Sequence, residues 1–229
     1  MFGAFPMNES IFFSHLLLMI SFLFVALRLG SVGLIVLVSL QTVFANIFVV
    51  KQIDLFGLSV TCSDVFIVGS LLALNLLQEF FGQESAKRAL KISLFSALFF
   101  VAMVEMHLLY VSNAADETGG AFIRIFSSTP RIVFASIAVF FLVQQIDMRL
   151  FQWMQKKAGG RHLPLRIGLA LAISQTIDTV LFSFAGLYGL VASVLAVIVV
   201  SLPIKFLSIA CSAPFTAFCS KFVKIRDPS

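Results

Sequence analysis

The chain has 229 residues, of which 60% are apolar and only 12% are charged, and its formal net charge is +5. Soluble domains are about 45–50% apolar and about 25% charged, and disordered chains are poorer still in apolar residues. The composition therefore excludes both classes and is typical of a polytopic membrane protein. At about 20 apolar residues for each transmembrane helix, the length allows about six to eight spans and leaves no room for a second, soluble domain.

Seven apolar stretches follow one another along the chain, and each is long enough to cross a bilayer as a helix. They cover residues 11–27, 31–50, 58–77, 92–111, 132–151, 167–188 and 191–218. No Lys or Arg precedes the first stretch and no small-residue cleavage site follows it, so we interpret it as a retained span and not as a signal peptide. In the last stretch, Pro203 and Pro214 allow a bend.

The basic residues predict the orientation of these spans, because Lys and Arg collect in cytoplasmic loops. One side of the predicted topology holds Arg28, Lys87, Arg88, Lys91, Lys156, Lys157, Arg161, Arg166, Lys221, Lys224 and Arg226. The other side holds Lys51, Arg124 and Arg131, together with Asp116 and Glu117. We therefore expect an outside N-terminus and a cytoplasmic C-terminus in a bacterial inner membrane. The positive charge then indicates no nucleic-acid partner.

Polar side chains inside the predicted spans are the candidates for function, because a charge at the bilayer centre costs about 2.5–3.5 kcal/mol. Several lie three or four residues apart and so share a helix face. These pairs are Asn75 with Glu79, Gln144 with Asp147, and Gln175 with Asp178. A carboxylate accepts hydrogen bonds, and an amide both donates and accepts them. Each pair therefore suits a ligand with neighbouring donors and acceptors.

Structural explanations for the same residues stay open. Asp178 and Lys205 lie well inside their spans, and they either pair with each other or form a functional site. Buried amides can simply hold helices together. Glu79 and Asp147 lie near predicted cytoplasmic ends, where a long side chain reaches the interface at little cost.

Enzymatic motifs are not found in the chain. It has no HExxH, GxSxG, P-loop or GxGxxG pattern, and without a P-loop it is not expected to hydrolyse ATP by itself. Its three cysteines, Cys62, Cys211 and Cys219, form no CxxC spacing and support neither a disulfide framework nor a metal site. The sequence therefore predicts a protein that is not an enzyme and has no cofactor.

The polar residues, taken in chain order, resemble the queuosine precursor transporter family, also called the vitamin uptake transporter family. The resemblance covers about residues 31–218. The first two elements are N-x4-K, at Asn46 and Lys51, and D-x3-E-x2-G, where Asn75 stands in the first position before Glu79 and Gly82. The third is R-x3-AS…Q-x2-D, at Arg131, Ser136, Gln144 and Asp147. The last two are SQ-x2-DT, from Ser174 to Thr179, and a lysine in the last span, Lys205. Five such elements in the expected order make a fairly specific pattern.

The resemblance implies a fold as well as a function. Members of this family are similar to the six-helix substrate-binding subunits of energy-coupling-factor transporters. We therefore expect an all-α polytopic membrane protein that forms a single transmembrane domain over residues 1–229. It would comprise an extra N-terminal span at 11–27, a six-helix core at 31–218 and a cytoplasmic tail at 219–229.

The resemblance also implies a substrate, a 7-deazaguanine base: preQ0, preQ1 or queuine. Asp178 and Glu79 would then read its N–H edges, with Asp147 as a third acid. Gln144, Gln175 and Asn46 would supply amide contacts, and Arg131 and Lys205 would neutralise buried acids or donate to the carbonyl of the base. Asn75 and Lys51 complete the predicted substrate-binding residues. Phenylalanine rings would stack on the base. The alternative is a substrate-capture subunit for another small vitamin, working with a shared ATP-driven module. The energy source and the oligomeric state stay open.

Overall fold

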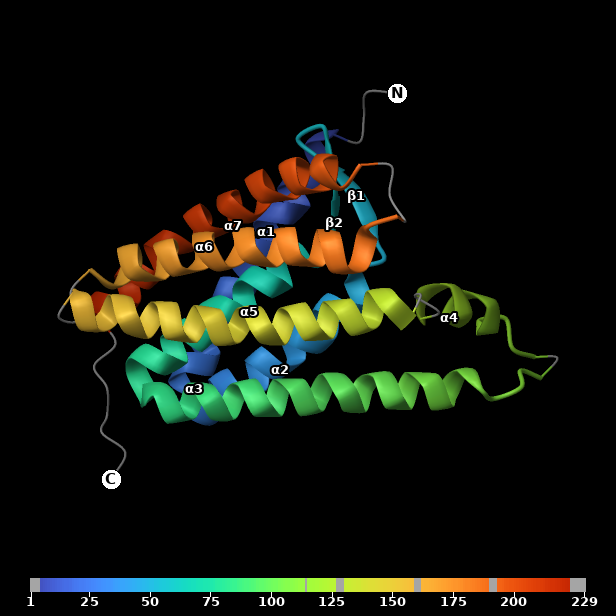
Figure 1. Ribbon diagram of the computed structural model, residues 1–229, viewed down its shortest axis with the longest axis horizontal. Helices are drawn as coiled ribbons and strands as arrows, with labels where there is room; N and C mark the ends of the chain where they lie inside the picture. Colours follow the sequence, from blue (N-terminus) through green and yellow to red (C-terminus); the bar gives the residue numbers. More distant parts are fainter. Residues whose placement is uncertain (1–4, 114, 127–129, 159–161, 190–192, 223–229) are drawn as a thin grey trace.

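The computed structural model describes residues 5–113, 115–126, 130–158, 162–189 and 193–222. These residues form a helical bundle with one short β-hairpin (Figure 1). The elements are α1 (Phe5–Arg28), α2 (Ser31–Phe48), β1 (Gln52–Leu55), β2 (Leu58–Thr61), α3 (Asp64–Leu108), α4 (Gly119–Phe126), α5 (Pro130–Lys157), α6 (Leu163–Phe182) and α7 (Val194–Phe222). A π-helical turn, Ser183–Leu187, continues α6.

Six helices of the described chain are long and apolar enough to cross a membrane, and one of them, α3, is folded in two. At Gly82 the backbone leaves helical geometry, with φ 82° and ψ 167°. This region is accessible almost only to glycine. The chain doubles back there, so the teal half of α3 leads to Gly82 and the green half runs back from it (Figure 1). The two halves correspond to the third and fourth predicted spans.

The predicted start of the third span was wrong, because residues 58–61 form strand β2 and the helix begins only at Asp64. β2 pairs with β1 in antiparallel register, Gln52 opposite Thr61. The turn between the strands has positive φ at Phe56 (51°) and Gly57 (77°), as in the tight turns that favour two-residue hairpins. The apolar residues of β2 alternate with polar ones, a strand period that the hydropathy of the longer stretch concealed.

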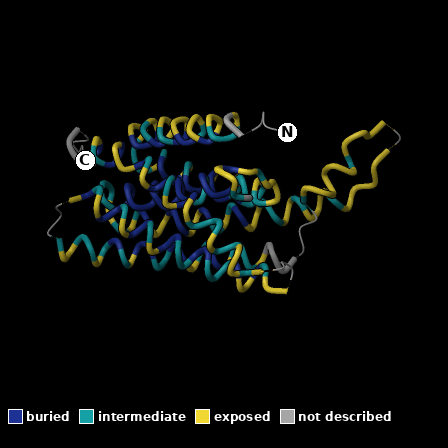
Figure 2. The backbone as a smooth tube through the Cα atoms, turned by 90° about the horizontal axis from the view of Figure 1, so that it is seen from above, coloured by how far each residue is buried: buried dark blue, intermediate teal, exposed yellow. Residues whose placement is uncertain are grey.

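Helix α4 was also not among the predicted elements. The Asp116 carboxylate caps its first turn by accepting the Thr118 N–H at 2.8 Å and the Gly119 N–H at 2.9 Å. Hydrogen bonds from the Ser112 hydroxyl and from Thr118 lower the pKa of Asp116 to about 2. Figure 2 shows α4 and the end of α3 projecting from the bundle as exposed segments. They therefore contribute little to the core.

The core of the bundle is formed by residues of α1, α2, α3, α5, α6 and α7, and Figure 2 shows the buried positions gathered in the middle of the bundle. Leu72, Leu74, Phe151 and Leu171 are completely buried there. Large apolar side chains such as Leu17, Phe95 and Leu195 instead face outward. Such a broad apolar exterior suits contact with lipid acyl chains and not with water.

The two ends of the bundle differ in charge. We call the end with β1, β2 and α4 the hairpin end, and the opposite end the Gly82 end. The Gly82 turn, the α5–α6 connection and the end of α7 all lie at the Gly82 end (Figure 1). The described basic residues that the sequence analysis assigned to one side, such as Lys87 and Lys156, therefore lie near this end, whereas Arg161, Lys224 and Arg226 lie outside the described residues. Lys51 and Arg124 lie at the hairpin end, as that analysis predicted.

Candidate functional site

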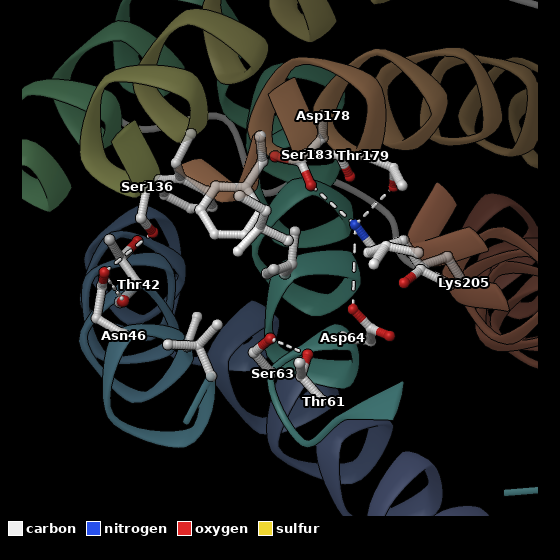
Figure 3. Close-up of a pocket in the computed structure, with 18 residues that line it drawn as sticks. Thr42, Asn46, Thr61, Ser63, Asp64, Ser136, Asp178, Thr179, Ser183 and Lys205 are labelled. Carbon is white, nitrogen blue, oxygen red and sulfur yellow. Dashed lines mark hydrogen bonds and ion pairs between the residues drawn. The ribbon is translucent and has the colours of Figure 1, made fainter. Parts of the chain in front are cut away.

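Three charged side chains meet inside the bundle near the hairpin end. Lys205 of α7 donates a hydrogen bond from Nζ to Asp178 Oδ2 at 2.8 Å and another to Thr179 Oγ1 at 3.0 Å. Its Nζ also lies 4.0 Å from Oδ1 of Asp64, the first residue of α3 (Figure 3). All three charged residues are at least 94% buried. This charge triad therefore joins α3, α6 and α7 within the membrane-spanning part of the chain.

The charge triad forms part of the lining of a pocket of about 90 Å³. Its described walls combine hydroxyl groups with aliphatic side chains, two phenylalanines and one amide. The polar and aromatic lining residues are Thr42, Asn46, Thr61, Ser63, Ser136, Phe140, Thr179, Phe182, Ser183 and Ser201, and most of the polar ones are labelled in Figure 3. Ser136 donates to Asn46 Oδ1 at 3.2 Å, which ties α5 to α2 across the pocket. Small-molecule sites usually measure about 300–1,000 Å³. To accept a two-ring base, the lining helices must therefore move apart.

A second group of polar residues lies deeper in the bundle. Asn75, Gln144, Asp147, Ser174 and Gln175 are all fully buried, and Ser174 donates a hydrogen bond to Asp147 Oδ1 at 2.7 Å. In the described chain, the amide groups of Gln144 and Gln175 have no hydrogen-bond partner. A buried polar group without a partner costs about 1–3 kcal/mol. We call this group the amide cluster, and its unused hydrogen-bonding capacity suits a ligand or water.

The pocket and the amide cluster adjoin each other. A small cavity of about 10 Å³ is lined by Gln144 of the cluster and by Thr42, Asn46 and Phe140, which also line the pocket. Modest movement of the surrounding side chains would therefore connect the two. The side chains on either side offer both hydrogen-bond donors and acceptors.

A second buried ion pair lies nearer the Gly82 end. Arg166 donates from Nη2 to Glu79 Oε1 at 2.8 Å and from Nη1 to Glu79 Oε2 at 3.0 Å. Gln155 Nε2 donates to the same Oε2 at 3.0 Å, and the guanidinium lies 5.2 Å from the ring centre of Phe151. This bidentate pair links α3, α5 and α6. Among the described residues, one positive and one negative charge balance there.

The residues predicted as a site are thus distributed along the bundle. Asn46, Asp178 and Lys205 line the pocket. Asn75, Gln144, Asp147 and Gln175 belong to the amide cluster, and Glu79 pairs with Arg166. Lys51 is exposed just beyond α2 and does not line the pocket, and Arg131 belongs to α5 but its side chain lies outside the described residues. The ligand roles assigned to these residues stay predictions.

Two charged residues with a place in this arrangement were not among the predicted site residues. Asp64 was assigned no role, although it lies within the predicted third span and a carboxylate inside an apolar stretch is itself a signal of function. Arg166 was counted with the basic loop residues. It directly precedes an apolar stretch, and nothing in its local sequence indicates that its partner would be Glu79, 87 residues earlier.

Comparison with known proteins places the chain among transporters. Residues 61–219 match the family model described as "Putative vitamin uptake transporter". The chain is also 31% identical, over 163 residues, to a protein of Bacillus subtilis (strain 168) named "Probable queuosine precursor transporter". That similarity covers 69% of this chain and 71% of the relative. No solved structure matches the chain. The matched region contains the charge triad, most of the pocket lining and the amide cluster, whereas α1 and α2 lie outside it.

Proposed function

Since the chain belongs to the vitamin uptake transporter family, we propose that this membrane protein imports a 7-deazaguanine precursor of queuosine into the bacterial cytoplasm. The name of the relative supports this substrate class. The observation that carries the proposal is a pocket within the membrane-spanning bundle whose lining combines buried charges, hydroxyl groups and aromatic rings. Such a lining suits a small polar heteroaromatic solute that cannot cross lipid unaided.

The chemistry of a deazaguanine fits the pocket lining. Its amino and ring N–H groups form an edge that a carboxylate accepts in bidentate fashion, which suits Asp178. Its carbonyl oxygen needs a donor, which Lys205 or Asn46 supplies. Its flat rings suit Phe140 and Phe182, since stacking on an aromatic side chain contributes about 1–3 kcal/mol. The amide cluster offers further contacts to a base that moves deeper into the bundle.

The two buried charge groups suit alternating access. We assign the Gly82 end to the cytoplasm, because the basic loops lie there. The Glu79–Arg166 pair then lies on the cytoplasmic side of the pocket and closes that route. A base would enter from the hairpin end, pass the charge triad and be released only after this pair separates. Asp64 and Glu79 are 15 residues apart on one half of α3, which corresponds to about 22 Å.

A second candidate is a capture subunit for another small vitamin, since the description of the matching family names vitamin uptake but no particular vitamin. Such a subunit would depend on an ATP-driven partner. Purification from its native membrane distinguishes the two candidates, because a capture subunit would retain an ATPase and a self-sufficient carrier would not.

A rescue assay tests the proposal. The chain is expressed in a bacterium that lacks both queuosine synthesis and its own precursor transporter but has the matching salvage enzymes. PreQ0, preQ1 or queuine is supplied separately at nanomolar concentration, and queuosine in tRNA is measured. We expect at least one base to restore the modification. If none does while the protein is present in the membrane, the proposed substrate class is wrong.

Matched variants connect the rescue to the pocket. Asp178→Asn removes a pocket carboxylate, whereas Glu84→Gln removes an exposed one that pairs with Lys87 at 2.7 Å on the helix surface. We expect only the first to abolish rescue, at equal protein abundance in the membrane. Equal rescue by both variants would show that the pocket carboxylate is not needed for transport.

A further inference from the structure

The charges on the described residues that line the pocket do not balance. Among its described lining residues, the charged side chains are Asp64, Asp178 and Lys205, so two carboxylates face one ammonium group. An unbalanced charge is costly in a region shielded from water. The described lining therefore becomes neutral when one further positive charge enters the pocket.

The two carboxylates are not equivalent. Asp178 accepts a hydrogen bond from Lys205 at 2.8 Å, whereas the nearest approach of Asp64 to Lys205 is 4.0 Å, beyond hydrogen-bond distance. Lys205 directs its other hydrogen bond to Thr179. Asp64 is 5% exposed, and its second oxygen, Oδ2, is buried with no hydrogen-bond partner. The unused negative charge of the pocket thus resides on Asp64.

The groups beside Asp64 suit an ammonium ion. Thr61 and Ser63 precede Asp64 in the chain, and their hydroxyl groups lie 2.8 Å apart in the pocket lining (Figure 3). An alkylammonium group has two or three N–H donors and no acceptor. A carboxylate and two hydroxyl oxygens can receive all of them, and a charge-assisted hydrogen bond to the carboxylate is the strongest of these contacts.

We propose that Asp64 binds a positively charged amine on the substrate and thereby makes the transporter selective for 7-deazaguanines with a cationic side arm. This inference rests on the proposed function and narrows its substrate class. PreQ1 carries an aminomethyl arm that is protonated at neutral pH, and queuine carries a secondary amine in the same position. PreQ0 carries a neutral nitrile, which has no proton to donate and cannot balance the charge.

Competition between preQ1 and preQ0 in the rescue host tests the inference. Initial uptake of each labelled base is measured at increasing concentrations of the other. We expect wild-type protein to take up preQ1 with at least about tenfold higher kcat/KM than preQ0, since a hydrogen bond to a charged group discriminates by about tenfold or more. In Asp64→Asn, preQ1 uptake should fall about tenfold while preQ0 uptake stays within about twofold.

Two further variants separate recognition from structural damage. Asp64→Glu keeps the charge and should keep the preference for preQ1, and it replaces Asp64→Asn as the informative variant if the latter does not reach the membrane. Asp178→Asn should lower uptake of both bases, because Asp178 is assigned to the amino and ring N–H edge that both bases share.

The outcomes distinguish this inference from the proposed function. Equal wild-type uptake of both bases, a preference for preQ0, an equal loss of both in Asp64→Asn, or loss of the preference in Asp64→Glu would overturn the role of Asp64. The transporter assignment would stand in each case. If wild-type protein carries none of the three bases, the proposed function fails and this inference fails with it.

Discussion

Two buried ion pairs lie along the same bundle, and they differ in what they leave unsatisfied. Near the Gly82 end, Arg166 donates hydrogen bonds to both carboxylate oxygens of Glu79, and Gln155 donates a third. Near the hairpin end, Lys205 pairs closely with Asp178 and leaves an oxygen of Asp64 without a partner. In the first pair, one positive and one negative described side chain balance each other. The second pair lines a pocket, where the described side chains include one more negative than positive charge.

This difference indicates different tasks. A complete, bidentate pair gains little from a ligand and holds its helices together, so it suits a closure that opens only in another conformation. An incomplete group gains from a ligand that supplies the missing charge. Burial by itself therefore does not identify a binding residue, since Glu79 and Asp178 are both mostly buried acids. The partners of the acid distinguish the two.

Breaking the complete pair should have the largest effect on stability. Arg166→Met leaves the mostly buried Glu79 carboxylate without its charged partner, which should destabilise the protein by about 3–5 kcal/mol. The double variant Arg166→Met/Glu79→Met should recover much of this loss, because it removes both charges. Unfolding in detergent measures both effects, with Glu84→Gln as the surface control. A loss below about 1 kcal/mol in Arg166→Met would contradict the role of a closing pair.

Breaking the incomplete group should cost less stability but more function. Asp178→Asn removes a charged hydrogen bond that is worth about 1.5–3 kcal/mol. Because Asp64 stays 4.0 Å from Lys205, the ammonium group keeps a counter-ion. We expect uptake to be abolished while the protein still reaches the membrane. Unfolding of Asp178→Asn and of Arg166→Met in detergent shows which variant loses more stability. Normal uptake by Asp178→Asn would show that the charge triad is not part of the binding site.

The turn at Gly82 allows a test of backbone strain close to the Glu79–Arg166 pair. Gly82→Ala places a side chain at φ 82°, where nothing lies within 4 Å of the added carbon, so backbone strain alone should cost about 1–3 kcal/mol. Gly168→Ala is the matched control, since the added carbon there also meets nothing within 4 Å and the backbone is helical. It should be neutral or stabilise by up to about 1 kcal/mol. An equal free energy of unfolding for the two variants would show that the backbone at Gly82 is not strained by a side chain.

The hairpin end should show the smallest effect. Asn8 of α1 donates a hydrogen bond from Nδ2 to the backbone oxygen of Asp54 at 3.0 Å, and this contact is exposed. Asn8→Ala should therefore cost less than about 1 kcal/mol of stability. Amide hydrogen exchange should become faster in β1 and β2 and stay unchanged around Gly82. Faster exchange at both ends would show that the two ends are coupled and weaken the comparison.

Much of the fold was predictable because it depends on local composition. Each of the seven predicted spans has a helical counterpart, since length and hydropathy are sufficient to indicate a membrane helix. The start of the third span was wrong because four residues of β2 are too short to stand out within an apolar stretch. The turn at Gly82 depends on a single backbone conformation, which the glycine permits but does not require.

The candidate site was predictable only in part, for a different physical reason. Because charged residues are expensive within a membrane, the sequence by itself identified Asp178 and Lys205 as a possible pair, and the 2.8 Å contact confirms that pairing. It also identified the buried amides. Only the tertiary structure decided that Asp64 joins the triad and that Glu79 pairs with Arg166. Such contacts depend on how each helix is rotated about its axis and how deeply it lies, and helix–helix packing sets both.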